Sequence, residues 1–186
     1  HHAERDKAMG FCFFNNVAIA AAYAKEKYKL QRVAIVDFDV HHGNGTQEIV
    51  SDKDGYLFCS TFQHPLYPHS GFEALNDNSS SLIINTPLAA NSASDEFRQA
   101  IINDWLPALE SFKPQIIFIS AGFDAHVEDD MSQISLTEAD YRWVTDQLKV
   151  IAEQYGEGRI ISLLEGGYSL GALGRSVVAH IKGLIG

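Results

Sequence analysis

Three acidic or histidine side chains alternate with apolar ones near residue 37. Asp37, Asp39 and His41 occupy every second position, and Phe38 and Val40 lie between them. In an extended chain the first three project to one side and the two apolar residues project to the other, toward packing. Two carboxylates and an imidazole placed so closely destabilise one another unless a positive charge lies among them. The spacing therefore predicts a divalent metal site.

A single strand rarely supplies a full set of metal ligands, so we expect a further carboxylate from a neighbouring strand. Asp124 follows the apolar run IIFISAGF and is the candidate. A set of Asp39, His41 and Asp124 leaves one or two positions for water and substrate, which is typical of catalytic rather than structural zinc. The alternative is that these acids cap turns or bind a calcium-like ion.

A histidine pair and a tyrosine could complete such a site. His1 and His2 could be the remnant of a purification tag, but the following AERDKAMGFCFFNN has the character of native sequence. A neutral imidazole near a metal-bound water can accept its proton, while a second imidazole stays protonated. Tyr168 follows two glycines, which allow a tight turn, and its phenol could donate to a developing oxyanion. An ordinary turn with a packed tyrosine is the alternative.

The elements that must position these residues are short apolar runs alternating with longer segments of helical period. The runs predict buried strands at 32–37, 56–61, 81–85, 115–120 and 159–164. The longer segments predict helices at 17–28, 95–112, 138–155 and 170–184, with Ser94 and Thr137 as N-caps and a kink or break at Pro107. This order predicts an α/β fold of three layers (αβα) with a mostly parallel sheet, in which chemistry gathers at the carboxyl ends of the strands.

Length and composition favour one globular domain spanning residues 1–186, since 46% of the residues are hydrophobic and 20% charged. The net charge of -10 would repel a nucleic acid, so we expect no direct nucleic-acid partner. There is no apolar run long enough for a membrane span and no secretory signal at the start. Cys12 and Cys59 are expected to be buried, reduced thiols, which suggests a cytoplasmic location.

Four segments in combination resemble the zinc-dependent histone deacetylase superfamily, and its class II and bacterial members more than class I. They are HHAERDKAMGFCFFNN, VDFDVHHGNGTQ, AGFDAHVEDD and LEGGYSL. The resemblance implies a sheet of the arginase/deacetylase type. It also implies a zinc-dependent amidohydrolase whose substrate is an acetylated amine, of the acetyl-lysine or acetylpolyamine type.

The resemblance implies two ion sites that share residues. Asp39, His41 and Asp124 would bind Zn²⁺. A monovalent cation, usually potassium, would lie near Asp37, Asp39, His41 and Ser60.

The resemblance also implies the catalytic groups. His2 would be the general base and acid, His1 its electrostatic partner and Tyr168 the donor that polarises the carbonyl. Asp37 would orient His1, and Asn44 would lie beside the second histidine. The substrate channel would be lined by Phe11, Tyr67 and Gly167.

Members of this superfamily are longer, and their histidine pair lies further along the chain. The resemblance therefore implies the C-terminal part of a deacetylase catalytic domain, lacking the N-terminal strands, the rim loops and an arginine of the pocket floor. We expect an assembled metal site with poor or absent activity, and a sheet edge that could pair with a second copy. The alternatives are a non-catalytic remnant acting as a metal-binding or assembly module, and an arginase-like hydrolase with two metals.

Several residues outside these motifs receive structural interpretations. The acidic cluster Glu128-Asp129-Asp130 is expected to be a solvated loop, although contact with a cationic substrate is an alternative. The segment Asp129-Asp130-Met131 departs from the usual Asp-Pro-Leu of the superfamily. His42 is expected to make structural hydrogen bonds.

Overall fold

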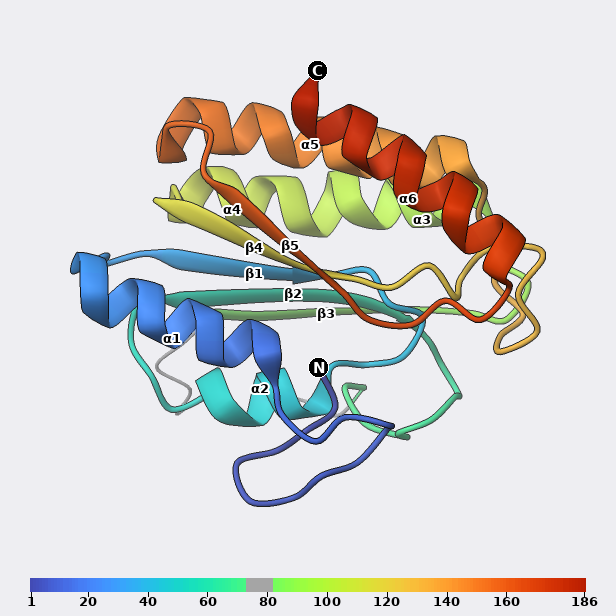
Figure 1. Ribbon diagram of the computed structural model, residues 1–186, viewed down its shortest axis with the longest axis horizontal. Coiled ribbons are helices and arrows are strands. Elements are labelled where there is room, and N and C mark those ends of the chain that lie inside the picture. Colours follow the sequence, from blue (N-terminus) through green and yellow to red (C-terminus); the bar gives the residue numbers. More distant parts are fainter. Residues whose placement is uncertain (73–81) are drawn as a thin grey trace.

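A parallel sheet of five strands forms the centre of the molecule. The computed structural model describes residues 1–72 and 82–186 (Figure 1). Within these residues the strands are β1 (Val33–Asp37), β2 (Tyr56–Gln63), β3 (Leu82–Leu88), β4 (Ile116–Ala121) and β5 (Ile160–Leu164). They lie in the order β3-β2-β1-β4-β5, and every neighbouring pair is parallel. The predicted strand at 81–85 begins at Ser81, which lies outside the described residues.

Helices cover both faces of the sheet, which confirms the predicted three-layer fold. Figure 1 shows α1 (Asn16–Tyr28) and α2 (Asn44–Val50) on one face. The other face carries α3 (Ser94–Ala100), α4 (Leu106–Phe112), α5 (Glu138–Gly156) and α6 (Leu170–Ile185).

The alternation of side chains along β1 explains where the site must lie. Ala34 and Val36 pack in the core under α3, α4 and α5, whereas Val33 and Ile35 pack in the core under α1 and α2. Because successive side chains of a strand point to opposite faces, Asp37 continues the second set. The catalytic candidates are therefore expected at the carboxyl edge of the sheet, on the side of α1 and α2.

The predicted helix at 95–112 is divided into three pieces. A π-helical turn (Ile101–Trp105) joins α3 to α4, and Pro107 lies in the first turn of α4, where its missing N–H costs little. The predicted N-cap Ser94 is wrong, because Ala93 occupies that position and the Ser94 hydroxyl instead donates to Asp140.

The other predicted N-cap is confirmed. Thr137 caps α5, and its backbone N–H donates to the Asp140 carboxylate at 2.9 Å.

One short helix was not predicted. The sequence of α2 contains glycine at its second position and no apolar repeat, so its helical form depends on tertiary contacts. The Thr46 N–H donates to the His1 carbonyl at 3.1 Å, and the Gly45 backbone lies so close to Ala3 that a Cβ would overlap the Ala3 carbonyl.

The outer edge of the sheet at β5 is open and apolar. Ile161 and Leu164 are exposed on β5, and Tyr23 and Tyr28 of α1 help to line a groove of about 610 Å³ beside it. Pairing of this edge with a second copy stays a prediction. Across the residues that the structure describes, none of the helices has the length and apolar character needed to span a membrane.

Candidate metal centre

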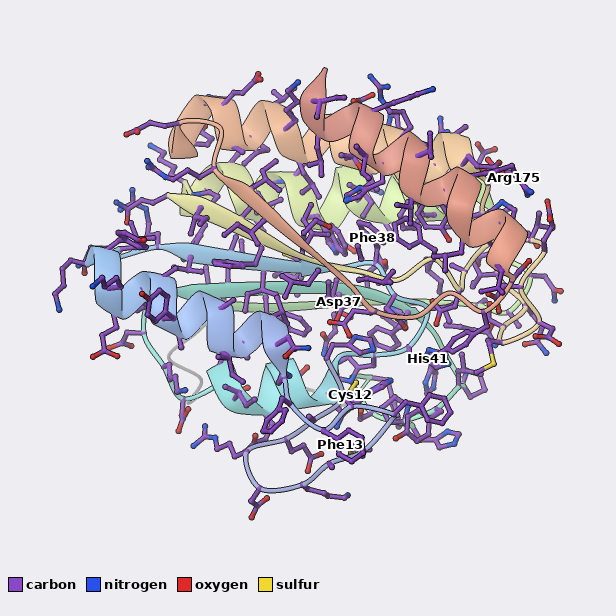
Figure 2. All side chains as sticks on the ribbon, in the orientation of Figure 1. Cys12, Phe13, Asp37, Phe38, His41 and Arg175 are labelled. Carbon is purple, nitrogen blue, oxygen red and sulfur yellow. The ribbon has the colours of Figure 1, made fainter. Side chains whose placement is uncertain are left out.

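Three strand ends bring the predicted site residues together. β1, β4 and β5 are neighbours and parallel, so the segments that follow them meet at one edge of the sheet. Figure 2 shows Asp37 and His41 on the side of the sheet that faces the N-terminal segment, and Phe38 on the side covered by α5 and α6. Phe38 packs against Tyr141 of α5, as the alternating pattern predicts.

The three predicted ligands converge. Asp39, His41 and Asp124 are buried, and one possible ligand atom of each lies within 4.8 Å of the others. The His41 Nδ1 lies 3.0 Å from Asp39 Oδ1 and 3.1 Å from Asp124 Oδ2. The parallel pairing of β1 with β4 therefore places one imidazole between two carboxylates.

The charges of this group favour a cation at its centre. Burial would lower the pKa of His41, but hydrogen bonds to the Asp124 and Asp39 carboxylates raise it to about 10. Burial and the neighbouring Asp39 charge raise the pKa of Asp124 to about 6. Burial also tends to raise the pKa of Asp39, but His1 and His41 hold it below its usual range. A divalent cation supplies the positive charge that these carboxylates require and leaves the imidazole neutral as a ligand.

The hydrogen bonds around the carboxylates leave one lone-pair direction free for an ion. Asp39 Oδ2 accepts from the Gly166 N–H at 2.8 Å, and Asp124 Oδ1 accepts from the Val40 N–H at 3.0 Å. Asp124 Oδ2 is buried, and its only partner within the described part of the chain is the His41 imidazole, whose Nδ1 lies 3.1 Å away. A Cβ at Gly166 would overlap this same oxygen, so the backbone approaches the site as closely as glycine allows. The donor set, with an Asp124 oxygen to which no backbone N–H donates, fits a zinc ion.

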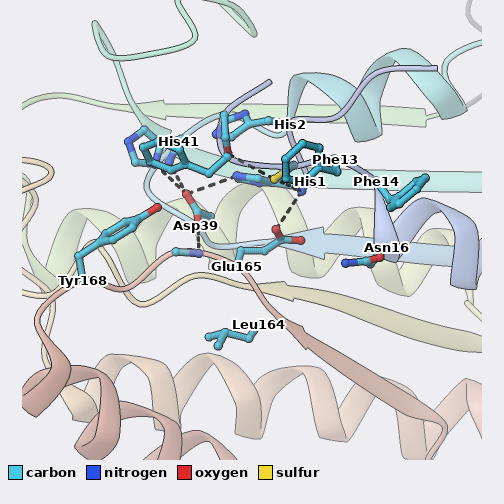
Figure 3. A pocket seen from close by; sticks show the side chains of 14 residues that line it. His1, His2, Phe13, Phe14, Asn16, Asp39, His41, Leu164, Glu165 and Tyr168 are labelled. Atoms are coloured by element: carbon cyan, nitrogen blue, oxygen red, sulfur yellow. Dashed lines mark hydrogen bonds and ion pairs between the residues drawn. The ribbon is translucent and has the colours of Figure 1, made fainter. Parts of the chain in front are cut away.

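The histidine pair lies directly beside the metal ligands. The His1 Nδ1 hydrogen-bonds Asp37 Oδ2 at 2.8 Å, and the His2 Nδ1 hydrogen-bonds Asn44 Oδ1 at 2.8 Å. The His2 ring lies 5.8 Å from the His41 ring, measured between centroids (Figure 3). The structure thus brings each histidine to the orienting partner that the sequence predicts.

The two histidines have opposite electrostatic environments. Burial alone would lower the pKa of His1, but the Asp37 and Asp39 carboxylates raise it well above its ordinary value. Burial and the nearby His1 lower the pKa of His2 to about 4. Burial raises the pKa of Asp37 to about 7 despite its bond to His1. His2 is therefore neutral at physiological pH, as a proton acceptor must be, while His1 carries the charge.

Tyr168 and two predicted channel residues line one cavity of about 330 Å³. The Tyr168 hydroxyl is on the side of the pocket that holds His41 and Asp39 (Figure 3). Burial raises the Tyr168 pKa to about 12, so the phenol keeps its proton. Gly167, also predicted in the channel, is not among the lining residues; with φ of 138° it shapes the turn before Tyr168. The cavity is lined by His2, Gly10, Phe11, His41, Tyr67, Met131 and Tyr168.

The residues of the expected monovalent-cation site are also adjacent. Ser60 on β2 is in register with Asp37 on β1, and its buried hydroxyl has no hydrogen-bond partner among the described residues. Potassium binding at Asp37, Asp39, His41 and Ser60 stays a prediction.

Sequence reasoning assigned no role to Glu165, and it misjudged two other residues. Glu165 is mostly buried next to the site, where it accepts from the Ser120 hydroxyl at 3.0 Å, and its place directly after β5 was the available signal. The expectation of a solvated acidic loop is wrong for Asp129, which is 5% exposed. The prediction of a buried Cys12 is also wrong, since this thiol is only half-buried and lines a second pocket that adjoins the first and includes His1 and Glu165. Cys59 is buried as predicted.

His42 makes the structural hydrogen bonds expected of it. Its Nδ1 pairs with the Ser70 hydroxyl at 2.8 Å and its Nε2 with the Gln47 side chain at 2.9 Å.

Comparisons with known proteins agree with this geometry. The Histone deacetylase domain matches residues 1–184. The chain is 38% identical to the histone deacetylase-like amidohydrolase of Pseudomonas aeruginosa, over 99% of this chain and 50% of that protein. It is also similar to the crystal structure of the HDA15 HD domain, with a TM-score of 0.90, 34% identity and coverage of 99% and 53% of the two chains.

A second solved structure belongs to the acetylpolyamine aminohydrolase of Burkholderia pseudomallei. The TM-score is 0.87 at 29% identity, and the match covers 98% of this chain and 53% of that one. These likenesses confirm the deacetylase type of fold. The chain spans half or less of the length of the first curated relatives that it matches.

Proposed function

Because this chain belongs to the histone deacetylase family, we propose that the protein is a zinc-dependent deacetylase that hydrolyses the amide of an acetylated amine. One observation carries the proposal: donor atoms of Asp39, His41 and Asp124 lie within 4.8 Å of one another next to a cavity that also contains His2 and Tyr168. A proton acceptor, a proton donor and three metal ligands are the groups that metal-assisted amide hydrolysis requires.

Asp39, His41 and Asp124 would hold the zinc ion through one atom each. When bound, zinc acts as a Lewis acid toward the acyl carbonyl and lowers the pKa of a bound water. The side chains around the ion would transfer the protons and stabilise the oxyanion.

His2 is suited to move protons. Its Nδ1 is fixed by Asn44, which leaves Nε2 for the attacking water, and its lowered pKa keeps it neutral before the reaction. After accepting the proton from the water, His2 can return it to the nitrogen of the leaving amine. His1, held by Asp37, remains cationic and favours the negative charge that develops on the carbonyl oxygen.

Tyr168 is suited to donate a hydrogen bond to that developing oxyanion, since its raised pKa keeps the phenol protonated. The walls at Phe11, Tyr67 and Met131 are apolar, so the cavity fits the aliphatic arm of an acetylated amine. Acetyl-lysine and acetylpolyamine share this arm, and both are proposed substrates.

The test is acetate release from an acetyl-lysine peptide and from an acetylpolyamine by the full protein and its Tyr168→Phe variant. We expect the variant to lower kcat by about 10²- to 10³-fold, because it loses one oxyanion donor. Zinc content measured by elemental analysis should stay at one ion per chain. The control is Tyr23→Phe, a change on the exposed face of α1. Equal rates for wild type and Tyr168→Phe would contradict the proposed role.

A further inference from the structure

Asp129 is a buried carboxylate that binds the backbone of two segments around the cavity. Its Oδ2 accepts hydrogen bonds from the N–H groups of Tyr168 at 2.6 Å and Ser169 at 3.0 Å. Its Oδ1 accepts from the Met131 N–H at 3.1 Å. The side chain is 5% exposed, whereas its neighbour Asp130 is exposed.

The position of this carboxylate is electrostatically favourable. Ser169 is the N-cap of the 16-residue helix α6, and its own side chain makes no capping hydrogen bond. Two consecutive N–H groups at the start of a helix favour a negative charge, which offsets the cost of burying Asp129. The acidic loop after β4 and the start of α6 are thus joined through one side chain.

A second contact joins the same two segments. Arg175 on α6 donates to Glu128 of the loop and to Glu138 at the start of α5, so residues that precede and follow Asp129 in the sequence are both tied to α6. Arg175 lies at the surface of the helix (Figure 2). Its ion pairs are solvent-exposed and contribute little to stability, whereas the Asp129 bonds are largely excluded from water.

Asp129 is bonded to one side of the turn that carries Tyr168. On one side of the turn, Gly166 is fixed by its N–H bond to Asp39 and by its carbonyl, which accepts from the Phe123 N–H at 2.8 Å. On the other side, the chain is fixed by Asp129. The Tyr168 side chain itself is 45% exposed, and its hydroxyl has no hydrogen bond to any described residue. The location of the phenol therefore depends on the backbone that Asp129 holds.

We propose that Asp129 is a positioning residue that fixes the Tyr168 phenol over the metal site and holds Met131 in the wall of the same cavity. The inference rests on the proposed function, in which Tyr168 stabilises the oxyanion. Asp129 acts through Tyr168, and it forms no hydrogen bond with Asp39, His41 or Asp124.

The experiment is a double-mutant cycle on kcat in the full protein, with Asp129→Ala, Tyr168→Phe and both together. Asp129→Ala should lower kcat by about 10²-fold when Tyr168 is present, because small displacements of a catalytic group have effects of this size. In the Tyr168→Phe background the same change should cost less than about threefold, since the hydroxyl it positions is gone. Asp129→Asn, whose amide oxygen still accepts hydrogen bonds, should recover part of the loss. Asp130→Ala is the matched control and should leave kcat unchanged.

A role limited to capping α6 would lower kcat by the same factor in both backgrounds, and that result would overturn the inference. A loss of kcat in Tyr168→Phe with no loss in Asp129→Ala would overturn it too, while leaving the proposed function intact.

A second readout is independent of activity. In protein labelled with 3-fluorotyrosine, the ¹⁹F NMR signal assigned through Tyr168→Phe should shift or broaden in Asp129→Ala and stay in place in Asp130→Ala. An unmoved Tyr168 signal in Asp129→Ala would refute the inference whether or not the protein deacetylates any substrate. Absence of deacetylation by the wild type would instead count against the proposed function alone.

Discussion

At Gly166 the metal site leaves no room for a side chain. Its N–H donates to Asp39, and any Cβ there would overlap Asp124 Oδ2, the oxygen assigned to the ion. We predict that Gly166→Ala weakens zinc binding by about 10- to 100-fold, the range typical of disturbed groups that orient metal ligands. Competition with a fluorescent zinc chelator measures the affinity.

The matched control for this change is Gly174→Ala on α6. A Cβ at Gly174 meets nothing within 4 Å, and alanine is favoured over glycine inside a helix. Zinc affinity should be unchanged in this variant. If Gly166→Ala binds zinc as tightly as Gly174→Ala, the close approach of Gly166 has no bearing on the site.

Single residues of the site were predictable to the extent that they follow strands. Asp37 is the last residue of β1, Asp39 and His41 continue its alternation, and Asp124 follows β4, so the parallel sheet alone brings them to one edge. Asp129 could not be predicted in this way. Three successive acids are typical of a solvated loop, and only the packing of α6 against that loop buries the middle one.

Among the elements, α5 and α6 are linked to the sheet edge by a buried neutral histidine. The Thr145 hydroxyl donates to the Tyr141 carbonyl, so it accepts from His180 Nδ1 at 2.6 Å. His180 Nε2 then accepts from the Ser162 hydroxyl on β5 at 2.8 Å. A proton on Nε2 would break this arrangement, and burial accordingly lowers the His180 pKa to about 4.

This pKa predicts how stability depends on pH. The unfolded chain binds a proton on His180 near pH 6.5, whereas the folded chain binds it only near pH 4. The contribution of neutral His180 is therefore fully present above about pH 6.5 and is lost as the pH falls toward 4. Between pH 7 and pH 5 the free energy of unfolding should fall by about 2 kcal/mol more in the wild type than in His180→Asn.

Urea unfolding at the two pH values measures this difference, and His69→Asn is the control because His69 is exposed. That control should show the full wild-type dependence on pH. Parallel pH dependence in the wild type and His180→Asn would show that His180 does not contribute.

Whole helices and strands were predicted well where their own amino-acid composition determines their conformation. They were predicted poorly where contacts with other parts of the chain determine it. Buried β-branched runs specify β1 and β4 because only strands with two covered faces are so uniformly apolar. In contrast, α2 has no such pattern, and its start is fixed by contacts with the N-terminal segment. The π-helical turn at Ile101–Trp105 likewise interrupts the segment 95–112, whose apolar period predicts one continuous helix.

At the scale of the whole molecule, the site is assembled from segments far apart in the sequence. The N-terminal segment, the loop after β1 and the turn after β5 each contribute side chains to one pocket (Figure 3). The loop after β4 contributes Asp124 to the metal site and Met131 to the adjoining cavity. Such a site exists only in the folded chain, so binding of an ion to it and folding are thermodynamically linked.

The central claim is that Asp39, His41 and Asp124 together bind one zinc ion, and anomalous diffraction at the zinc absorption edge tests it most directly. A crystal grown with zinc should show one strong anomalous peak among the three side chains, about 2.0–2.2 Å from one atom of each. The peak should be absent in an Asp124→Ala crystal prepared in the same way. A wild-type crystal with no peak among these residues, or with zinc bound only elsewhere, would contradict the account.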